Sequence, residues 1–595
     1  MFTDYVSPDR AHYRKIRIES LYIKMRDGVR LAVDILLPAP ASAGTRFPVL
    51  LHQTRYWRLP ELRRPFRWFS QGLLGHEAGY VKELVLSGYV FVNVDCRGSG
   101  ASFGQRPYPW SPDEIRDGGE VVDWILRQPW ANGQVGGVGI SYTGTAAEML
   151  LVNQHPAVKG SMALFSLYDV YDDIACPFGI PHATFLREWG RANALLDENR
   201  LPITDLLPRL LVRGVKPVGG RRGHRELAAA LHDHRENLHV SETSRGIIYR
   251  DQPPSNGIVT SMDDFSPHHF QDRIDGSGAA VYSASGWYDG AYPHASIRRY
   301  LNSGAKFNRL LLGPWDHGAK YHITPGQSRK LGSEAVREGV RFFDHILKGQ
   351  DNGLASDPPV RYFTLQQEQW KTAPTWPPPG SRSQTWYLRE NGGLAPEPPT
   401  ESEARDELRH DPAQGTGEAT RWACLRSQVK TPNYYPDRKV RDRQLTVYDS
   451  LPLAADLTVT GHPVAVLYLR SRAEDGSFFV YLEEVTVEGA VHYITEGGLR
   501  ALHRNLAEVP EYRDVVPPRT YRQAAGAPLV AGEVARLEFD LLPISYRLRK
   551  GSRLRVALAT ADRDNFAPIC PEGSVYELLR DAAHPSGVVL PVMEE

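Results

Sequence analysis

Residues 134–149 decide the fold and read Gln-Val-Gly-Gly-Val-Gly-Ile-Ser-Tyr-Thr-Gly-Thr-Ala-Ala-Glu-Met. An apolar run with strand character ends in a glycine and a serine, and a run that can be helical follows. This pattern is typical of a nucleophile elbow, which needs a small residue two positions before the serine because a Cβ would collide there. Gly139 meets that need, so Ser141 is the candidate nucleophile.

The elbow pattern is irregular after the serine. Thr143 occupies the position where a second glycine is usual, and Gly144 follows one place later. A Gly-x-Ser sequence next to an apolar run also occurs in ordinary turns. The functional interpretation of Ser141 therefore depends on partners elsewhere in the chain.

Composition limits the class of protein. A chain of 595 residues should divide into roughly two to four domains, and its 70 Lys+Arg balance its 70 Asp+Glu. This balance argues against a nucleic-acid partner or an anionic membrane surface. There is no signal-peptide run and no long apolar stretch, so we expect a cytoplasmic protein that acts on a small molecule. A homo-oligomer stays an open alternative to a monomer. The scattered cysteines, without a Cys-x-x-Cys pair, fit a reducing compartment: Cys96, Cys176, Cys424 and Cys570.

The pattern of predicted strands and helices changes three times along the chain, which predicts four segments. Alternating strand and helix patterns predict an α/β-hydrolase domain in two parts, over 1–165 and 266–370. Its expected strands are 30–38, 47–52, 89–95, 135–140, 158–165, 279–287 and 308–312. The irregular region 166–265 between the parts has helix candidates and no persuasive strand, which indicates an inserted helical cap. A proline-rich stretch after Trp370 leads into short β-rich runs over 371–595, which indicate a C-terminal jelly-roll β-sandwich.

Within the first part, residues 111–114 read Ser-Pro-Asp-Glu and predict the start of a helix. Serine suits the N-cap, proline suits the first helical position, and Glu114 stands where it can complete a capping box.

A serine nucleophile needs a base to accept its proton and an acid to orient that base. In α/β-hydrolases the acid and the histidine follow the serine in that order, on loops after strands. The strand at 279–285 leads to Asp289, and the strand at 308–312 leads to His317. Asp289 is therefore the predicted acid and His317 the predicted base. Asp316 is disfavoured as the acid because a sequence neighbour usually points its side chain away from the histidine.

The oxyanion of acyl transfer also needs hydrogen-bond donors. The N–H of Tyr142 follows the elbow, and the hydroxyl of Tyr56 is the natural second donor because its loop lacks the His-Gly-Gly-Gly sequence of lipases. We expect neither a metal nor a cofactor. Four further residues are interpreted as structural: His268, His269, Asp172 and Asp173. The alternative for the two aspartates is that they face the substrate.

Five motifs together resemble the CocE/NonD group of serine hydrolases, relatives of the X-Pro dipeptidyl-peptidase family and of α-amino-acid ester hydrolases. In chain order they are Arg55-Tyr56, Asp95-Cys96-Arg97-Gly98, Gly139 to Gly144, Gly286 to Asp289 and Gly313 to His317. The resemblance implies a second elbow glycine one place late, a helical cap and a C-terminal jelly roll. It also implies a triad of Ser141, Asp289 and His317, with Tyr56 and the Tyr142 N–H as the oxyanion hole.

The expected activity is that of a serine esterase or amidase working through an acyl-enzyme on Ser141. A preference for free α-amino substrates is doubtful, because no acidic residues closely follow Asp289. The alternatives are an acyltransferase or cyclase with the same triad and an X-Pro-type dipeptidyl peptidase. A non-enzymatic binding protein is disfavoured because all three triad positions are filled. The aromatic side chains expected to wall the substrate pocket are Trp57, Trp287, Tyr288, Tyr292 and Trp315.

Overall fold

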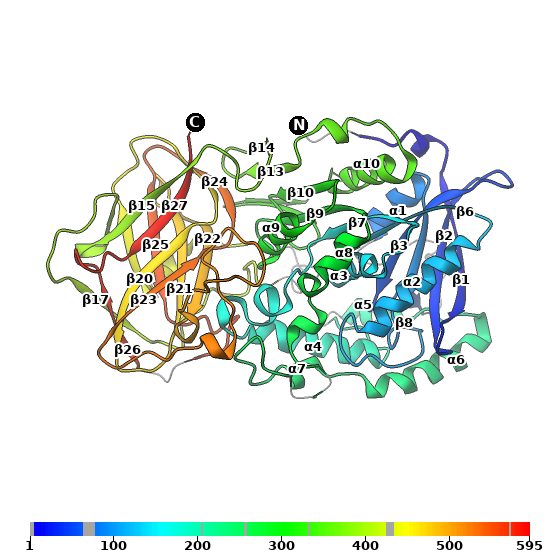
Figure 1. The fold of residues 1–595 in the computed structure, drawn as a ribbon, viewed down its shortest axis with the longest axis horizontal. Helices are drawn as coiled ribbons and strands as arrows, with labels where there is room; N and C mark the ends of the chain where they lie inside the picture. Colours follow the sequence, from blue (N-terminus) through cyan, green and yellow to red (C-terminus); the bar gives the residue numbers. More distant parts are fainter. Residues whose placement is uncertain are drawn as a thin grey trace.

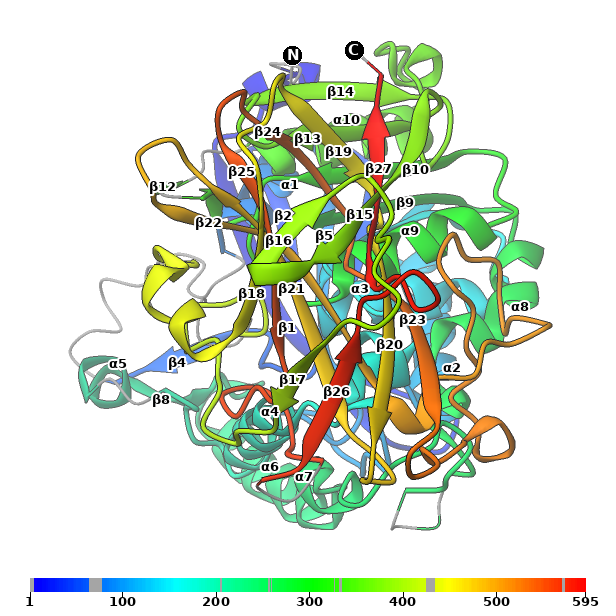
Figure 2. The same ribbon diagram turned by 90° about the vertical axis from the view of Figure 1, so that its left-hand side faces the viewer.

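The computed structural model describes residues 5–63, 78–203, 206–254, 257, 259–325, 327–330, 334–423, 434–569 and 573–594. Cys424 and Cys570 lie outside these ranges, and Cys96 and Cys176 are buried free thiols. In Figure 1 a strand-rich C-terminal part lies on the left and an α/β part on the right, with cap helices along the lower edge. Figure 2 shows the same arrangement from the side of the C-terminal part.

A ten-stranded sheet forms the α/β part, and its central strands are parallel. Both end strands pair in the antiparallel direction, at β1–β2 and at β13–β14. Across the sheet the strands are β1 Lys15–Lys24, β2 Arg30–Ala39, β5 Val90–Asp95, β3 Phe47–Thr54, β6 Ala131–Ile140, β7 Val158–Leu164, β9 Ala280–Gly286, β10 Asn308–Gly313, β13 Val360–Thr364 and β14 Gln369–Ala373.

Helices cover both faces of this sheet because its strands are apolar on both sides. Leu50 of β3 faces a core formed with α1 (Ala78–Leu86) and α10 (Glu334–Lys348), whereas Val49 and Leu51 face the core of α2 (Pro112–Leu126) and α3 (Tyr142–Met149). Such alternation follows from the two-residue period of a strand. Two further helices, α8 (Gln271–Gly276) and α9 (Tyr292–Asn302), flank β9 in the chain.

The cap contains the helices α4 Ala183–Asp197, α5 Leu206–Leu211, α6 Gly220–Asp233 and α7 Val240–Thr243. It also contains β8 (Val212–Val215), which pairs with β4 (Pro60–Leu62) of the preceding segment. The cap is helical as expected, and β8 is a short strand that the sequence pattern did not indicate. Because β8 has four residues and depends on a partner distant in sequence, it leaves no periodic pattern that sequence analysis can detect.

The C-terminal part is a curled thirteen-stranded β structure around one apolar core. Its strands are β15 Ser381–Arg389, β16 Gly393–Ala395, β17 Arg405–Arg409, β18 Thr446–Ser450, β19 Leu457–Gly461, β20 Val464–Ser471, β21 Ser477–Val485, β22 Val491–Arg500, β23 Val534–Asp540, β24 Ile544–Leu548, β25 Arg553–Ala559, β26 Val575–Leu579 and β27 Gly587–Met593. A separate hairpin joins β11 (Tyr321–Thr324) to β12 (Gln327–Lys330).

The predicted fold class, an α/β-hydrolase with an inserted cap and a C-terminal jelly roll, is confirmed. The four segment boundaries stay predictions. One local difference is that β14 continues past Trp370 to Ala373, into the beginning of the proline-rich stretch.

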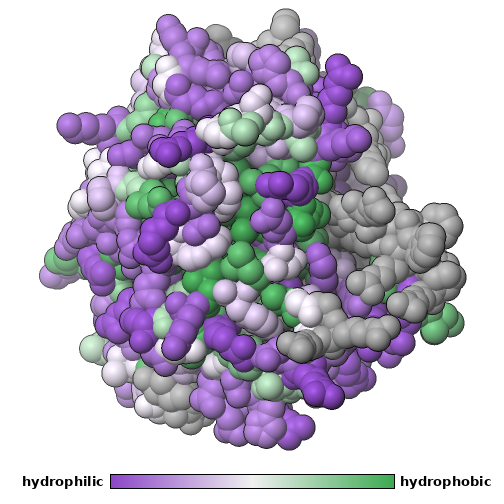
Figure 3. Space-filling model, turned by 90° about the vertical axis from the view of Figure 1, so that its right-hand side faces the viewer, coloured by the Kyte–Doolittle hydropathy of each residue, from purple (hydrophilic) through white to green (hydrophobic). Residues whose placement is uncertain are grey.

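No helix among the described ranges combines the length and apolarity needed to cross a membrane. On the face seen in Figure 3, opposite the C-terminal part, apolar side chains gather near the middle and hydrophilic ones surround them.

The Asp95-to-Gly98 motif has a structural role at the end of β5. Asp95 accepts bonds from the Arg58 N–H at 2.6 Å and from the Ala101 N–H at 2.9 Å. The Arg58 guanidinium lies 2.9 Å from Asp95 and 3.2 Å from Asp34, and all three side chains are fully buried. One cation therefore pairs with two buried carboxylates and ties the loop after β3 to the neighbouring strands β2 and β5.

We predict that Arg58→Met lowers the free energy of unfolding by about 3–5 kcal/mol, because both carboxylates lose their partner in a place that water does not reach. The matched control is Arg17→Ala, since Arg17 and its partner Glu19 are 66% and 48% exposed. That change should cost at most about 0.5 kcal/mol. Guanidinium unfolding of both variants checks the difference, and equal losses would contradict this role of Arg58.

Candidate active site

The backbone at Ser141 is held in a strained conformation between β6 and α3. Its φ of 62° and ψ of −126° are rare for a residue with a side chain. A Cβ on Gly139 would lie 2.3 Å from the backbone of Thr143, and a Cβ on Gly144 would lie 2.7 Å from the Leu164 carbonyl oxygen. Both glycines are therefore needed for close backbone contacts, and the late second glycine has a physical reason.

Residues at the start of α2 contact Tyr142, the residue that follows Ser141 in the elbow. Ser111 caps α2 through the Glu114 N–H at 3.4 Å, as expected. The Glu114 carboxylate, however, accepts a bond from the Trp110 N–H at 3.2 Å and from the Tyr142 hydroxyl at 2.7 Å. Burial raises the pKa of Glu114. The Tyr142 ring also stacks on Trp110, with ring centroids 4.6 Å apart, so the residue after Ser141 is fixed on two sides.

Asp289 and His317 meet beyond the ends of β9 and β10. Asp289 Oδ1 lies 2.8 Å from His317 Nδ1, and both side chains are buried. Burial opposes a charge on the imidazole, but the charge and hydrogen bond of Asp289, with a contribution from Asp316, outweigh it and raise the pKa of His317. Burial raises the pKa of Asp289 in turn, although His317 opposes this.

Ser141 and His317 share neighbouring residues at the end of the sheet, Phe165 and Tyr292. The Ser141 N–H donates to the Leu164 carbonyl at 2.9 Å, and the ring of the next residue, Phe165, lies 6.1 Å from the His317 ring. The Tyr292 ring lies 5.4 Å from His317 and lines the cavity that also contacts Ser141.

The loop that carries Asp289 is held by Arg421 of the C-terminal part. The Arg421 guanidinium donates to the Gly290 carbonyl at 2.9 Å and to the Trp287 carbonyl, and the Gly290 N–H donates back to the Arg421 carbonyl at 2.9 Å. Arg421 is fully buried. Sequence analysis did not find this residue, because a single arginine among β-rich runs carries no local signal.

Asp316 is turned away from the imidazole it precedes. Its Oδ1 accepts the Tyr321 N–H at 2.8 Å. Burial, with repulsion from Asp289, raises the pKa of Asp316 to about 7. The hydrogen bond of His317 Nδ1 goes to Asp289 rather than to this neighbour.

Tyr56, the candidate second oxyanion donor, lies at the end of β3 next to the elbow. Its ring packs edge-on against Tyr142 at 6.0 Å. Its hydroxyl oxygen accepts the indole N–H of Trp189, a cap residue, at 2.8 Å. Both Tyr56 and Ser141 line one cavity.

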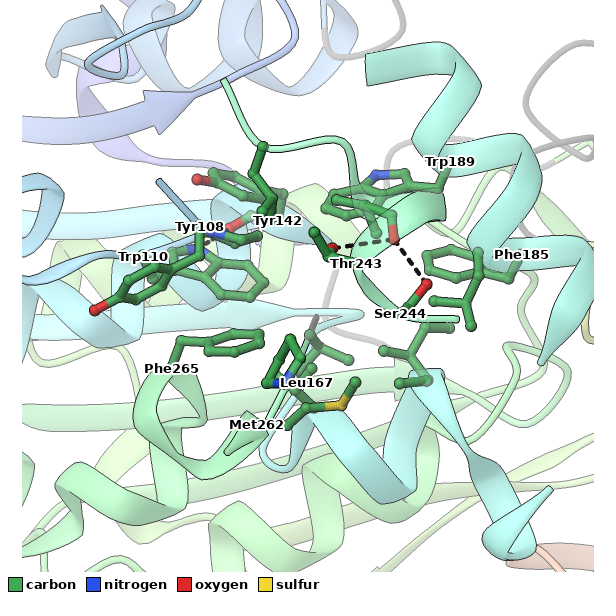
Figure 4. A pocket seen from close by; sticks show the side chains of 18 of the residues that line it. Tyr108, Trp110, Tyr142, Leu167, Phe185, Trp189, Thr243, Ser244, Met262 and Phe265 are labelled. Atoms are coloured by element: carbon green, nitrogen blue, oxygen red, sulfur yellow. Dashed lines mark hydrogen bonds between the residues drawn. The ribbon is translucent and has the colours of Figure 1, made fainter. Parts of the chain in front are cut away.

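This cavity has a volume of about 90 Å³ and an apolar wall. Phe185 and Trp189 of α4 approach from one side, Tyr108, Trp110 and Tyr142 from the other, and Leu167, Met262 and Phe265 close it (Figure 4). The lining residues within the described ranges include no Asp, Glu, Lys or Arg. The α4 residues in the wall have helical spacing: Phe185, Leu186 and Trp189. This apolar stripe is a sequence signal for the pocket that the sequence analysis did not use.

Only one of the five expected pocket aromatics, Tyr292, lines the cavity. The expectation for the other four is corrected, because their side chains pack against other parts of the fold and do not line the cavity. The Trp57 indole N–H donates to the Leu196 carbonyl at 3.3 Å, and that of Trp287 donates to the Phe363 carbonyl at 2.7 Å. Tyr288 packs on Tyr493 of the C-terminal part, and Trp315 packs between Phe165 and Trp370.

Asp172 and Asp173 do not line the cavity and belong to a buried network with Arg298, at 2.7 and 3.2 Å. His268 lies within reach of Asp169 and Asp263, a grouping whose donor atoms could hold a metal ion. Both carboxylates already contact the Arg250 guanidinium, at 3.0 Å for Asp263. A cationic side chain therefore supplies the charge that a metal would bring.

Comparison with known proteins decides the family. The profile of the X-Pro dipeptidyl-peptidase (S15) family matches residues 27–319, and that of its C-terminal non-catalytic domain matches residues 352–588. A Mycobacterium bovis protein named "Putative serine esterase" is 44% identical over 621 residues, which cover 99% of this chain and 98% of that protein. The chain belongs to the X-Pro dipeptidyl-peptidase (S15) family of serine hydrolases.

One further relative and one solved structure also match this chain over nearly its whole length. The cocaine esterase of Rhodococcus sp. is 25% identical over 622 residues, covering 97% of this chain and 98% of that protein. A crystal structure of a CocE/NonD family hydrolase from Staphylococcus aureus shares the fold, with a TM-score of 0.69 at 17% identity, covering 98% of this chain and 94% of that one. The S15 resemblance inferred from the five motifs is confirmed.

Asp289, which contacts His317, and Asp316, which precedes it in sequence, should affect the pH profile differently when each is replaced. If neutral His317 is the base, kcat/KM falls as the pH drops through its raised pKa. Asp316→Asn removes the smaller of the two contributions that raise this pKa, and Asp316 is itself half protonated near pH 7, so the acid limb should move only slightly to lower pH while most of the turnover remains. Asp289→Asn should reduce kcat by roughly 10⁴-fold, because the imidazole loses its orienting acceptor.

The measurement is the pH dependence of kcat/KM for both variants and the wild type. A loss for Asp316→Asn as large as that for Asp289→Asn would contradict the assignment of the orienting acid.

Proposed function

We propose that the chain hydrolyses esters of neutral, apolar acyl groups through an acyl-enzyme on Ser141. His317 takes the serine proton as Ser141 attacks the carbonyl carbon, and Asp289 holds the imidazole through Nδ1 and stabilises its cation. The alcohol leaves with the proton from His317. Water, activated by the same imidazole, then releases the acid and restores Ser141.

The observation that carries the proposal is the buried 2.8 Å contact between Asp289 and His317, on loops at the same sheet edge as the strained Ser141. The Tyr142 N–H, at the first position of α3, and the Tyr56 hydroxyl are the proposed oxyanion donors. A preformed pair of donors acts on the charge that develops in the transition state, so it lowers the barrier without reorganisation.

The cavity supports the choice of acyl group. Its apolar wall contacts Ser141 and offers no charged partner within the described ranges, and an ammonium or carboxylate buried there would stay unpaired. An X-Pro-type peptidase must hold a charged N-terminus, and the carboxylates of Asp172 and Asp173 are already paired with Arg298. The structure therefore favours an esterase over the peptidase that the family name describes.

Ser141→Ala tests the nucleophile. Turnover of p-nitrophenyl butyrate should fall by roughly 10⁴-fold or more, because the attacking oxygen is removed. Ser166→Ala is a matched control, since Ser166 is a fully buried serine one residue beyond Phe165. A Ser141→Ala variant that keeps near-native turnover would overturn the proposal.

The acyl preference is tested with esters of one leaving group. We predict that p-nitrophenyl butyrate exceeds the p-nitrophenyl esters of glycine and of succinate in kcat/KM by at least about 100-fold, because the cavity leaves their charges unpaired. Comparable rates for the charged esters would contradict the assignment of the apolar cavity to the acyl group. Adding a competing alcohol or amine to the same assay shows whether transfer rather than hydrolysis is favoured.

A further inference from the structure

The hydroxyl of Tyr56 can act as an oxyanion donor only when its proton points toward the reacting carbonyl. A phenol hydroxyl is both a donor and an acceptor, and its hydrogen rotates to suit its neighbours. The group that fixes this rotation is therefore part of the machinery, although it does not touch the reacting atoms.

Trp189 is placed to fix that rotation. Its indole Nε1 lies 2.8 Å from the Tyr56 hydroxyl oxygen. An indole N–H is only a donor, so Tyr56 accepts this bond and keeps its own proton for donation in another direction. Accepting a hydrogen bond also strengthens a hydroxyl as a donor, because the bonds of a chain polarise one another.

The helix that carries Trp189 is tied to the Tyr56 loop a second time. Asp197, the last residue of α4, accepts a bond from Arg55 at 3.3 Å and from Arg106 at 3.0 Å. Arg55 immediately precedes Tyr56, and its guanidinium carbon lies 5.5 Å from the centre of the Trp189 ring. Helix α4 thus contacts the side chain of Arg55 as well as the hydroxyl of Tyr56, the proposed donor.

The same indole is also a wall of the acyl cavity. The Trp189 ring stacks on Phe185, with centroids 5.9 Å apart and planes 13° apart, and both rings line the cavity beside Ser141 (Figure 4). An acyl group in the cavity would pack against the ring whose N–H holds Tyr56.

We infer that Trp189 is a positioning residue that orients the Tyr56 hydroxyl. Through it the cap supports one of the two proposed oxyanion donors. Because the indole also contacts the acyl group, filling the cavity holds Tyr56 in its donating position, and acyl preference is expressed in kcat as well as in KM. This inference rests on the proposed role of Tyr56 as an oxyanion donor.

The test compares variants at neighbouring positions of α4, with p-nitrophenyl butyrate and p-nitrophenyl acetate as substrates. Trp189→Phe keeps an aromatic wall and removes the N–H, so kcat should fall by about 3- to 10-fold with little change in KM. Phe185→Leu alters the same wall but keeps the indole N–H, so it should change KM and lower kcat less than Trp189→Phe does. Trp189→His retains a ring N–H donor at a similar reach and should recover part of the kcat lost in Trp189→Phe, which a merely structural role would not predict.

A double-mutant cycle with Tyr56→Phe separates this inference from the proposed function. Tyr56→Phe alone should lower kcat by about 10²- to 10³-fold. In that background Trp189→Phe should cost nothing further, because the hydroxyl it orients is gone. The affinity for a trifluoromethyl ketone, which forms a tetrahedral oxyanion on the serine, should follow the same pattern.

Three outcomes are decisive. An unchanged rate for Tyr56→Phe would overturn the oxyanion assignment itself. A normal loss for Tyr56→Phe, with wild-type kcat in Trp189→Phe, would overturn only the inference about Trp189. So would a Trp189→Phe loss that persists in full in the Tyr56→Phe background.

Discussion

The site depends on one backbone constraint, the strained turn at Ser141. The chain can make that turn only because Gly139 and Gly144 allow backbone atoms to approach to distances that a Cβ would forbid. The turn places the Ser141 side chain at the end of β6 and the Tyr142 N–H at the start of α3 in a single step. The strain persists because the surrounding contacts over-determine it: Tyr142 is bonded to Glu114, stacked on Trp110 and buried between two layers.

Each part of the chain contributes to this turn or to its partners. The parallel sheet places the loops after β3, β6, β9 and β10 at one edge, which is where α/β sheets carry their sites. The cap adds the apolar wall and the indole of Trp189. The C-terminal part, matched by a domain described as non-catalytic, contributes Arg421, which holds the acid loop by its backbone. The three parts are therefore coupled through hydrogen bonds to backbone carbonyls and one tyrosine hydroxyl.

The elements that sequence analysis predicted are those with local signals. The strand-turn-helix pattern at Ser141 and the loops after two apolar runs needed only short-range periodicity and chain order, and the structure brings Asp289 and His317 together as expected. The pocket could not be predicted in this way. Trp287 and Trp315 stand beside the acid and the histidine in sequence, yet the sheet edge buries both, whereas Phe185 and Trp189 reach the site through tertiary packing of the cap. Arg421 and β8 depend likewise on partners far away in the chain.

The central claim is that Ser141 forms the acyl-enzyme, and the most direct measurement is mass spectrometry of the full-length protein after reaction with a fluorophosphonate. We expect one label per chain, located by peptide mapping on Ser141, with labelling that slows as the pH falls and His317 becomes protonated. A label on another residue, or no label on a folded protein that hydrolyses p-nitrophenyl butyrate, would contradict the account.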